Sequence, residues 1–169
     1  MMEEKFLDFS HAIYEDLSAI VKIYNSSIPG RMATADTEPV SVKDRERWFH
    51  EHSPESRPLW VLRYKGEICA WLSFQSFYGR PAYNSTCEVS IYVAEEFQGQ
   101  GLGYYLLKKA LDNCQNLRIK TLVGFVFSHN ESSLKLFYSL GFYSWGHLPK
   151  VAELDGIERD LIIVGKRIF

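Results

Sequence analysis

The sequence predicts a mixed α/β fold, with a central mixed β-sheet of about seven strands flanked by about four helices. Segments with the short apolar pattern of strands alternate with segments that have the 3.6-residue period of amphipathic helices. In addition, Thr121–Phe127 is nearly all apolar, which is typical of a strand buried on both faces by helices. The predicted order is one strand, two helices, three strands, a helix, a strand, a helix and two strands.

The first half of the chain is expected to hold two helices and three strands. Apolar residues between Leu17 and Ile28 recur on one helical face, and Pro29-Gly30 ends that pattern. Lys65-Gly66 separates two strand-like segments, which predicts a β-hairpin. The elements predicted here are a strand over Lys5–Phe9, helices over Glu15–Ile28 and Val42–His52, and hairpin strands over Leu59–Tyr64 and Glu67–Phe74.

The second half is expected to continue the sheet and to add two helices. Asn130 is a good N-cap and Gly141 a good residue just past a helix end, so a short helix is expected between them. The elements predicted here are a strand over Glu88–Val93, a helix over Gly101–Gln115, a strand over Thr121–Phe127, a helix over Glu131–Leu140, and strands over Phe142–Leu148 and Ile157–Ile168.

Length and composition indicate one globular domain over residues 1–169. Hydrophobic residues make up 46% and charged residues 24%, and the net charge is −2 without a basic run, so no nucleic-acid partner is expected. The three cysteines form no CxxC pair and the histidines lack metal-ligand spacing, so neither a disulfide framework nor a metal site is expected. No signal peptide or membrane-spanning run is apparent, which predicts a cytoplasmic protein.

One stretch predicts an anion site. The strand-like Val89–Val93 is followed by Gln98-Gly-Gln-Gly101-Leu-Gly103 and then by a helical pattern. Glycines let the backbone approach a ligand, and the free N–H groups of a first helical turn attract phosphate. A P-loop would need Lys and then Ser or Thr after the last glycine, where Tyr104 and Tyr105 stand. A Rossmann turn would need G-x-G-x-x-G and a later acidic residue, and both are missing.

Two blocks resemble the GNAT superfamily of N-acetyltransferases. Gln98-x-x-Gly101-x-Gly103 is similar to its acetyl-CoA-binding turn, and Asn130–Phe142 is similar to its last helix and following strand. Arg80-Pro-Ala-Tyr83 and Glu88–Val93 resemble the phosphinothricin acetyltransferase branch, as does Thr37-Glu38-Pro39. Enzymes of that branch acetylate the α-amine of phosphinothricin, methionine sulfoximine or methionine sulfone. The resemblance therefore implies direct transfer of acetyl from acetyl-CoA, no metal, and a homodimer.

The resemblance also implies roles for individual residues. Glu88 is the expected general base, and Arg80, Tyr83 and Glu88 are expected to bind the substrate. The Val93 N–H is expected to contact the thioester carbonyl or the pantetheine arm, and Asn130 to hydrogen-bond that arm. The full set expected to bind acetyl-CoA is Ile91, Tyr92, Val93, Gln98, Gly99, Gln100, Gly101, Leu102, Gly103, Asn130 and Ser133.

One position departs from the family pattern. In many GNAT enzymes the leaving thiolate takes a proton from a Tyr seven residues after the Asn that corresponds to Asn130, and the phosphinothricin branch usually has His there. In this chain that position is Phe137. Tyr138 is next in sequence and is the candidate acid, although a side chain one residue on points about 100° round a helix. The alternative is that Tyr138 is a packed or surface tyrosine without a catalytic role, and that water assists departure of the thiolate.

Three alternatives stay open at this point. The acceptor could be another amine, such as a polyamine or a peptide N-terminus. The chain could also be a non-catalytic acyl-CoA-binding module, which Phe137 favours and Glu88 disfavours. Finally, Arg31–Pro39 has no clear period and fits either a solvated loop or a flap over a cleft.

Overall fold

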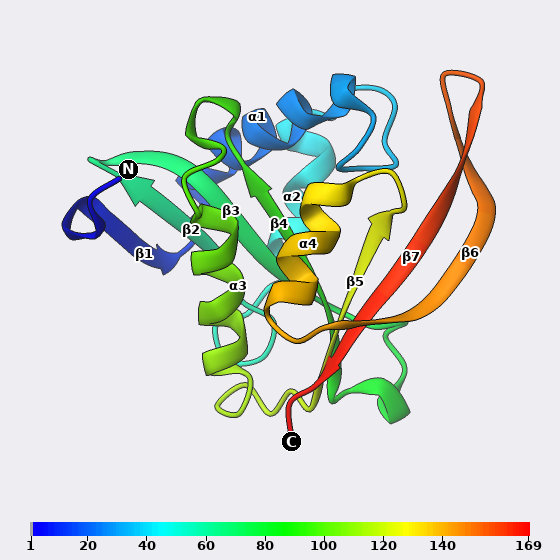
Figure 1. Cartoon of the computed structure of the whole chain (residues 1–169). Coiled ribbons are helices and arrows are strands. Elements are labelled where there is room, and N and C mark those ends of the chain that lie inside the picture. Colours follow the sequence, from blue (N-terminus) through cyan, green and yellow to red (C-terminus); the bar gives the residue numbers. More distant parts are fainter. Residues whose placement is uncertain (1) are drawn as a thin grey trace.

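The computed structural model describes residues 2–169, and these residues form one seven-stranded sheet in the order β1-β2-β3-β4-β5-β7-β6 (Figure 1). Neighbouring strands are antiparallel except β4 and β5, which are parallel. The strands are β1 (Leu7–His11), β2 (Leu59–Tyr64), β3 (Glu67–Ser76), β4 (Thr86–Val93), β5 (Thr121–Phe127), β6 (Tyr143–Leu154) and β7 (Ile157–Arg167). The predicted fold class is confirmed.

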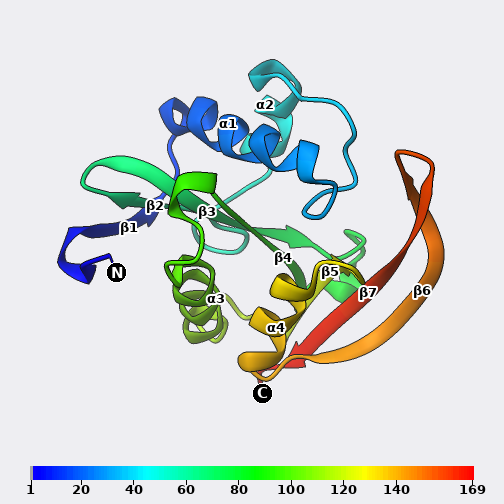
Figure 2. The same cartoon turned by 45° about the horizontal axis from the view of Figure 1, so that its top comes forward.

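The four α-helices lie in two layers with the sheet between them, as Figure 2 shows. On one side lie α1 (Leu17–Ser27) and α2 (Val42–His50), and on the other α3 (Leu102–Asn113) and α4 (Glu131–Ser139). Alternate residues of a strand face opposite sides. Thus Leu72 and Phe74 of β3 pack in the larger core under α3 and α4, whereas Trp71 packs with Ile20 of α1.

The sheet divides between its two parallel strands. Three pairs join β4 to β5, and the last of them is Glu88 with Val123. Beyond that pair the two strands diverge within the described part of the chain, as Figure 1 shows. From Val89 to Val93, β4 stays paired to β3 on its other side. Its backbone on the β5 side is therefore open to a ligand.

Most element boundaries differ from the sequence-based expectation by one or two residues, and two of the differences have a clear structural cause. The first strand begins at Leu7 rather than Lys5, because Glu4–Phe6 forms a 3₁₀ turn. The strand expected to end at Leu148 instead runs to Leu154, since a bulge after Leu148 accommodates Pro149 without ending the strand. The long β6–β7 hairpin turns at Asp155 and Gly156, both with positive φ. Among residues 2–169, no helix has the length and apolarity to cross a bilayer.

Candidate active site

Three cross-strand pairs form the floor of a cavity on the α1–α2 side of the sheet. Gln75 lies opposite Glu88, Ser73 opposite Ser90, and Trp71 opposite Tyr92. These residues alternate with core residues such as Phe74 and Val89, so they all face the same side. The cavity has a volume of about 180 Å³ and is lined by Ile20, Val21, Tyr24, Arg45, Trp48, Trp71, Ser73, Gln75, Glu88, Ser90 and Tyr92.

Glu88 occupies the point where this cavity meets the divergence of β4 from β5. It is half-buried and is the last β4 residue that pairs with β5. Burial raises the pKa of its carboxyl group, because removing the carboxylate from water disfavours its charged form. A carboxylate with a raised pKa is a better proton acceptor for an ammonium group than an ordinary glutamate.

A second cavity, of about 480 Å³, also reaches Glu88. Its lining includes Gln75 from the first cavity together with Glu51, His52 and Arg57. The buried Nε2 of His52 has no hydrogen-bond partner among residues 2–169, and burial lowers the pKa of this imidazole. Glu88 therefore lines both cavities.

The glycine turn has the backbone geometry of an anion site. Gly101 is the N-cap of α3 with φ 82°, and Gly99 has φ 74°, so both adopt a conformation that favours glycine. The first N–H groups of a helix lack intrahelical partners and carry the positive end of the helix dipole. Gln98 Nε2 donates to the carbonyl of Val93 at 3.2 Å and so fastens the turn to β4.

Gly103 has a packing role besides the predicted ligand contact. A Cβ at this position would lie 3.0 Å from Cδ2 of Leu136, so its lack of a side chain lets α3 pack closely against α4. Ile91 and Val93 likewise turn their side chains toward the core under α3. What they can present to a ligand is therefore backbone from the open edge of β4.

Asn130 caps α4 and also binds the early loop. Its Oδ1 accepts from the N–H of Ser133 at 3.3 Å, while its Nδ2 donates to the carbonyl of Met32 at 3.3 Å.

Two tyrosines of the cavity also bind the early loop. The hydroxyl of Tyr92 donates to the carbonyl of Ala33 at 3.1 Å. The hydroxyl of Tyr24 bonds to Thr34 and Asp36. The segment Arg31–Pro39 is thus fastened to cavity-lining residues, which favours the flap interpretation over a solvated loop.

The residues predicted for substrate carboxylate binding lie elsewhere. Arg80 and Tyr83 belong to an exposed turn before β4, and Tyr83 packs edge-on against Phe77 with ring centroids 5.5 Å apart. Within the described part of the chain, neither belongs to the lining of the two cavities that reach Glu88. The structure therefore does not bring Glu88 into one cavity with the two residues that were expected to share its substrate.

The candidate acid Tyr138 also lies outside the lining of both cavities among residues 2–169. Its side chain is 44% exposed, whereas Phe137 is buried. Phe137 packs edge-on against Phe142 at 5.0 Å, and its ring lies over Gly124, where a Cβ would be 3.0 Å from the ring. Position 137 is therefore part of the core under α4, which explains why an apolar ring is accommodated there.

Several residues of the cavity were not expected from the sequence. Arg45 and Trp48 are separated by three positions on α2 and so share one helical face. Ser73 and Gln75 alternate with core residues on β3. That alternation could have indicated the cavity, because polar residues at alternate positions of an otherwise apolar, buried strand suggest a face that contacts a ligand.

The fold and this arrangement of a split sheet, a glycine turn and a buried carboxylate define an acyl-CoA-dependent transferase class, and comparison with known proteins agrees. The family model "Acetyltransferase (GNAT) family" matches residues 17–142, and the chain belongs to this family. The expectation of an N-acetyltransferase of the phosphinothricin acetyltransferase type is confirmed at the level of family, fold and homologues.

Individual relatives narrow the resemblance. The chain is 53% identical to "Putative phosphinothricin acetyltransferase YwnH" of Bacillus subtilis, over 93% of this chain and 96% of that protein. It is 29% identical to the L-methionine sulfoximine/L-methionine sulfone acetyltransferase of Pseudomonas paraeruginosa, over 86% of each chain. The structure of yncA from Salmonella typhimurium with its cofactor acetyl-CoA superposes with a TM-score of 0.90 at 26% identity, covering 97% of this chain and 95% of that one.

Proposed function

We propose that this protein transfers acetyl directly from acetyl-CoA to the α-amino group of a small amino-acid analogue of the phosphinothricin, methionine sulfoximine or methionine sulfone type. The position of Glu88 carries the proposal: it is a desolvated carboxylate where an amino-acid-sized cavity meets the open edge of β4. The names of the relatives support the substrate class, and the yncA complex supports acetyl-CoA as the acetyl donor.

The residues around the split in the sheet suit acetyl-CoA. The turn from Gln98 to Gly103, with the first N–H groups of α3, would hold its pyrophosphate. The open edge of β4 up to Val93 would hydrogen-bond the pantetheine arm as a neighbouring strand would. Asn130 already donates its amide N–H to Met32, so a contact with pantetheine would need that bond to be shared or exchanged.

The proposed reaction begins at Glu88. Its carboxylate accepts a proton from the substrate ammonium, directly or through water, and the neutral amine attacks the thioester carbonyl. The N–H of Val93 stabilises the oxyanion that develops on that carbonyl. The attack forms the carbon–nitrogen bond, and collapse of the tetrahedral intermediate breaks the carbon–sulfur bond. The nitrogen loses its second proton to give the neutral amide, and the released thiolate takes up a proton.

Two groups are candidates for the source of the proton that the thiolate takes up. Tyr138 is the candidate acid, and its exposure is compatible with the alternative that water supplies the proton. Tyr138→Phe decides between them by steady-state kinetics. A role as acid requires at least a tenfold loss of kcat with an unchanged KM for acetyl-CoA. A kcat within twofold of wild type would assign the proton to water.

Thiol release from acetyl-CoA over a panel of amines tests the proposed function. The panel holds methionine sulfone, methionine sulfoximine, phosphinothricin, spermidine and a short peptide. We expect turnover with the first three, and about a 100-fold loss in Glu88→Gln with an unchanged Kd for acetyl-CoA. Release only with spermidine or the peptide would refute the acceptor class. Acetyl-CoA binding without release for any amine would favour the non-catalytic module.

A further inference from the structure

We propose that Arg45 is the residue that selects the acceptor: its guanidinium binds the carboxylate of the amino acid whose amine Glu88 deprotonates. This inference rests on the proposed function. It adds the group that recognises the substrate's carboxylate, while Glu88 acts on the substrate's ammonium. It assigns to α2 a role that the predicted pair Arg80 and Tyr83, outside the cavity, would otherwise have to fill.

The charges of the cavity match those of a free α-amino acid. Among the residues that line it, Arg45 and Glu88 alone carry a formal charge, one positive and one negative. They form no ion pair with each other within the described part of the chain: Arg45 pairs with Asp36, which lies outside the lining, and Glu88 has no charged partner there. An α-amino acid brings one ammonium and one carboxylate, which are complementary to these two groups.

The guanidinium of Arg45 keeps unused donors. Its Nη2 donates to Oδ2 of Asp36 at 3.0 Å, and within residues 2–169 its Nε and Nη1 have no hydrogen-bond partner. Arginine has five N–H donors, enough for Asp36 and for a two-pronged contact with a carboxylate. By contrast, Arg57 at the second cavity donates from Nε, Nη1 and Nη2 to protein acceptors, so it has less to offer a ligand.

Its surroundings hold the Arg45 side chain in place before any ligand arrives. The guanidinium lies over the ring of Tyr24, with Cζ 4.7 Å from the ring centroid, and 5.9 Å from that of Trp48. Asp36 also accepts from the hydroxyl of Tyr24, so the acid, the phenol and the arginine form one cluster. A guanidinium fixed in this way loses little further freedom when it binds a carboxylate.

The size of the cavity suits a single amino acid. A volume of about 180 Å³ is below the range of roughly 300–1,000 Å³ that is common for drug-sized ligands. The aromatic residues Tyr24, Trp48, Trp71 and Tyr92 supply apolar walls for a side chain. A polyamine brings no carboxylate to Arg45, and a peptide N-terminus brings an amide in its place. Both alternatives therefore leave the free N–H donors of Arg45, which already pairs with Asp36, without a ligand carboxylate.

The test compares two acceptors that differ only at the carboxylate, L-methionine sulfone and its carboxamide, in the full-length protein. We expect Arg45→Gln to lower kcat/KM for the acid about 100-fold and to leave that for the carboxamide within threefold. Arg47→Gln is the matched control, because Arg47 lies on the same helix with its side chain 93% exposed. Arg45→Lys should recover part of the selectivity that Arg45→Gln loses. Lysine restores the positive charge but lacks the two parallel N–H donors of the guanidinium.

Other outcomes separate the failure of this inference from that of the proposed function. Equal losses for both acceptors in Arg45→Gln, with unchanged melting temperature and acetyl-CoA affinity, would overturn the carboxylate role. Loss of selectivity in Arg80→Gln but not in Arg45→Gln would return the role to the turn before β4. If Arg45→Gln does not fold, equal kcat/KM of the wild type for the acid and the carboxamide overturns the inference. Turnover of neither acceptor refutes the proposed function itself.

Discussion

At the residue scale, the chemistry of the site follows from one carboxylate in an unusual place. The strand that carries Glu88 is apolar on its other face, and the nearest neighbours of Glu88 on its own face, Gln75 and Ser90, carry no charge. No positive partner within residues 2–169 offsets the loss of water, so burial alone raises its pKa. The protein thus holds a carboxylate under conditions that oppose its charge, which is the usual arrangement for a general base.

The raised pKa of Glu88 predicts a pH-dependent cost in stability. Because folding raises this pKa above its ordinary value of 4.5, the protonated carboxyl favours the folded state, and that contribution is lost as pH rises through the folded pKa. Glu88→Gln should therefore have a higher melting temperature than wild type at pH 8, and the difference should shrink below pH 4.5. Thermal unfolding at several pH values checks this, with Gln75→Glu, on the same floor, expected to show the opposite sign.

Residues in linear motifs could be predicted from the sequence, whereas residues assembled from distant elements could not. The spacing of the glycine turn indicates Gly101, and the family resemblance indicates Glu88 in the strand just before that turn. Arg45 and Ser73 are brought to one cavity by the packing of α2 over β3, and neither position is distinctive by itself. Arg80 was expected on resemblance alone, and the structure places it in an exposed turn outside the cavity.

At the element scale, the turn before α3 shows that its glycines serve different needs. Gly99 and Gly101 have positive φ with open space around the position of a Cβ, so their requirement is conformational. Gly103 lies inside α3 and faces Leu136, so its requirement is close packing. The spacing of the three glycines predicted the turn correctly, but the sequence could not assign these separate reasons.

Gly101→Ala should weaken acetyl-CoA binding more than it weakens the fold. Alanine at φ 82° costs about 1–2 kcal/mol of stability, and relieving that strain moves the N–H groups that begin α3. We expect a several-fold higher Kd for acetyl-CoA, measured by calorimetry. Gly79→Ala is the control, since Gly79 also has positive φ (64°) and open space but lies in the turn before β4. Equal effects of both variants on the Kd would contradict this explanation.

The boundaries of the elements were harder to predict than their existence. The sixth strand was expected to end at Leu148, just before Pro149, a residue that cannot donate to a β-ladder. The structure places Pro149 in a bulge and continues β6 to Leu154. Asp155-Gly156 is a common hairpin-turn pair, so the longer hairpin had a local signal in the sequence.

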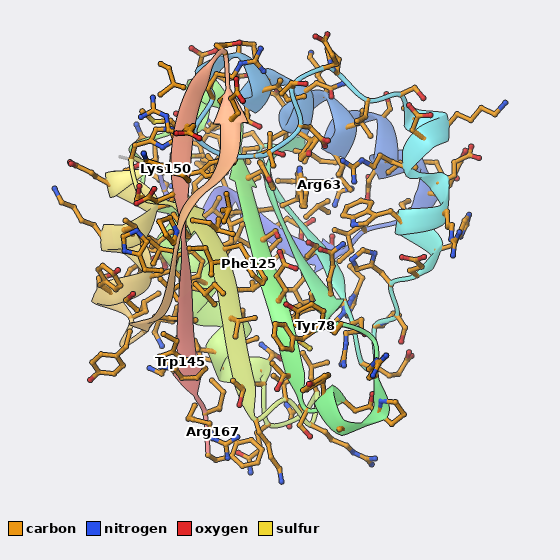
Figure 3. The ribbon with its side chains drawn as sticks, turned by 90° about the vertical axis from the view of Figure 1, so that its right-hand side faces the viewer. Arg63, Tyr78, Phe125, Trp145, Lys150 and Arg167 are labelled. Atoms are coloured by element: carbon orange, nitrogen blue, oxygen red, sulfur yellow. The ribbon has the colours of Figure 1, made fainter. Side chains whose placement is uncertain are left out.

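At the scale of the whole molecule, the β6–β7 hairpin is the feature that extends farthest from the two helical layers (Figure 1). Figure 3 shows Trp145 and Lys150 along this hairpin, at the outer edge of the sheet. Several large apolar side chains on it are exposed: Tyr143, Trp145, Leu148, Val151 and Ile157. Exposed apolar side chains concentrated on one hairpin favour the proposed homodimer over a monomer.

Light scattering after size-exclusion chromatography tests the homodimer. We expect a mass of twice the 19.6 kDa of one chain. The double variant Val151→Lys with Ile157→Lys should shift the protein toward the monomer, because charged groups on an apolar contact remain unpaired. Tyr104→Lys on α3, which replaces another exposed aromatic residue, should leave the mass unchanged. A wild-type mass of 19.6 kDa at all concentrations rules the dimer out.

The fork at which β4 and β5 separate has a consequence for how such a site can change. Glu88 is at the last rung before the fork, and its neighbours Cys87 and Val89 are buried in the opposite core. Since consecutive residues of a strand face opposite sides, a shift of β4 by one position would exchange their places. A carboxylate would enter the apolar core and a thiol or a valine would face the substrate. A single-residue insertion or deletion in this strand would therefore remove the proposed base from the cavity and damage the core together, so the position of this carboxylate is tied to the register of the sheet.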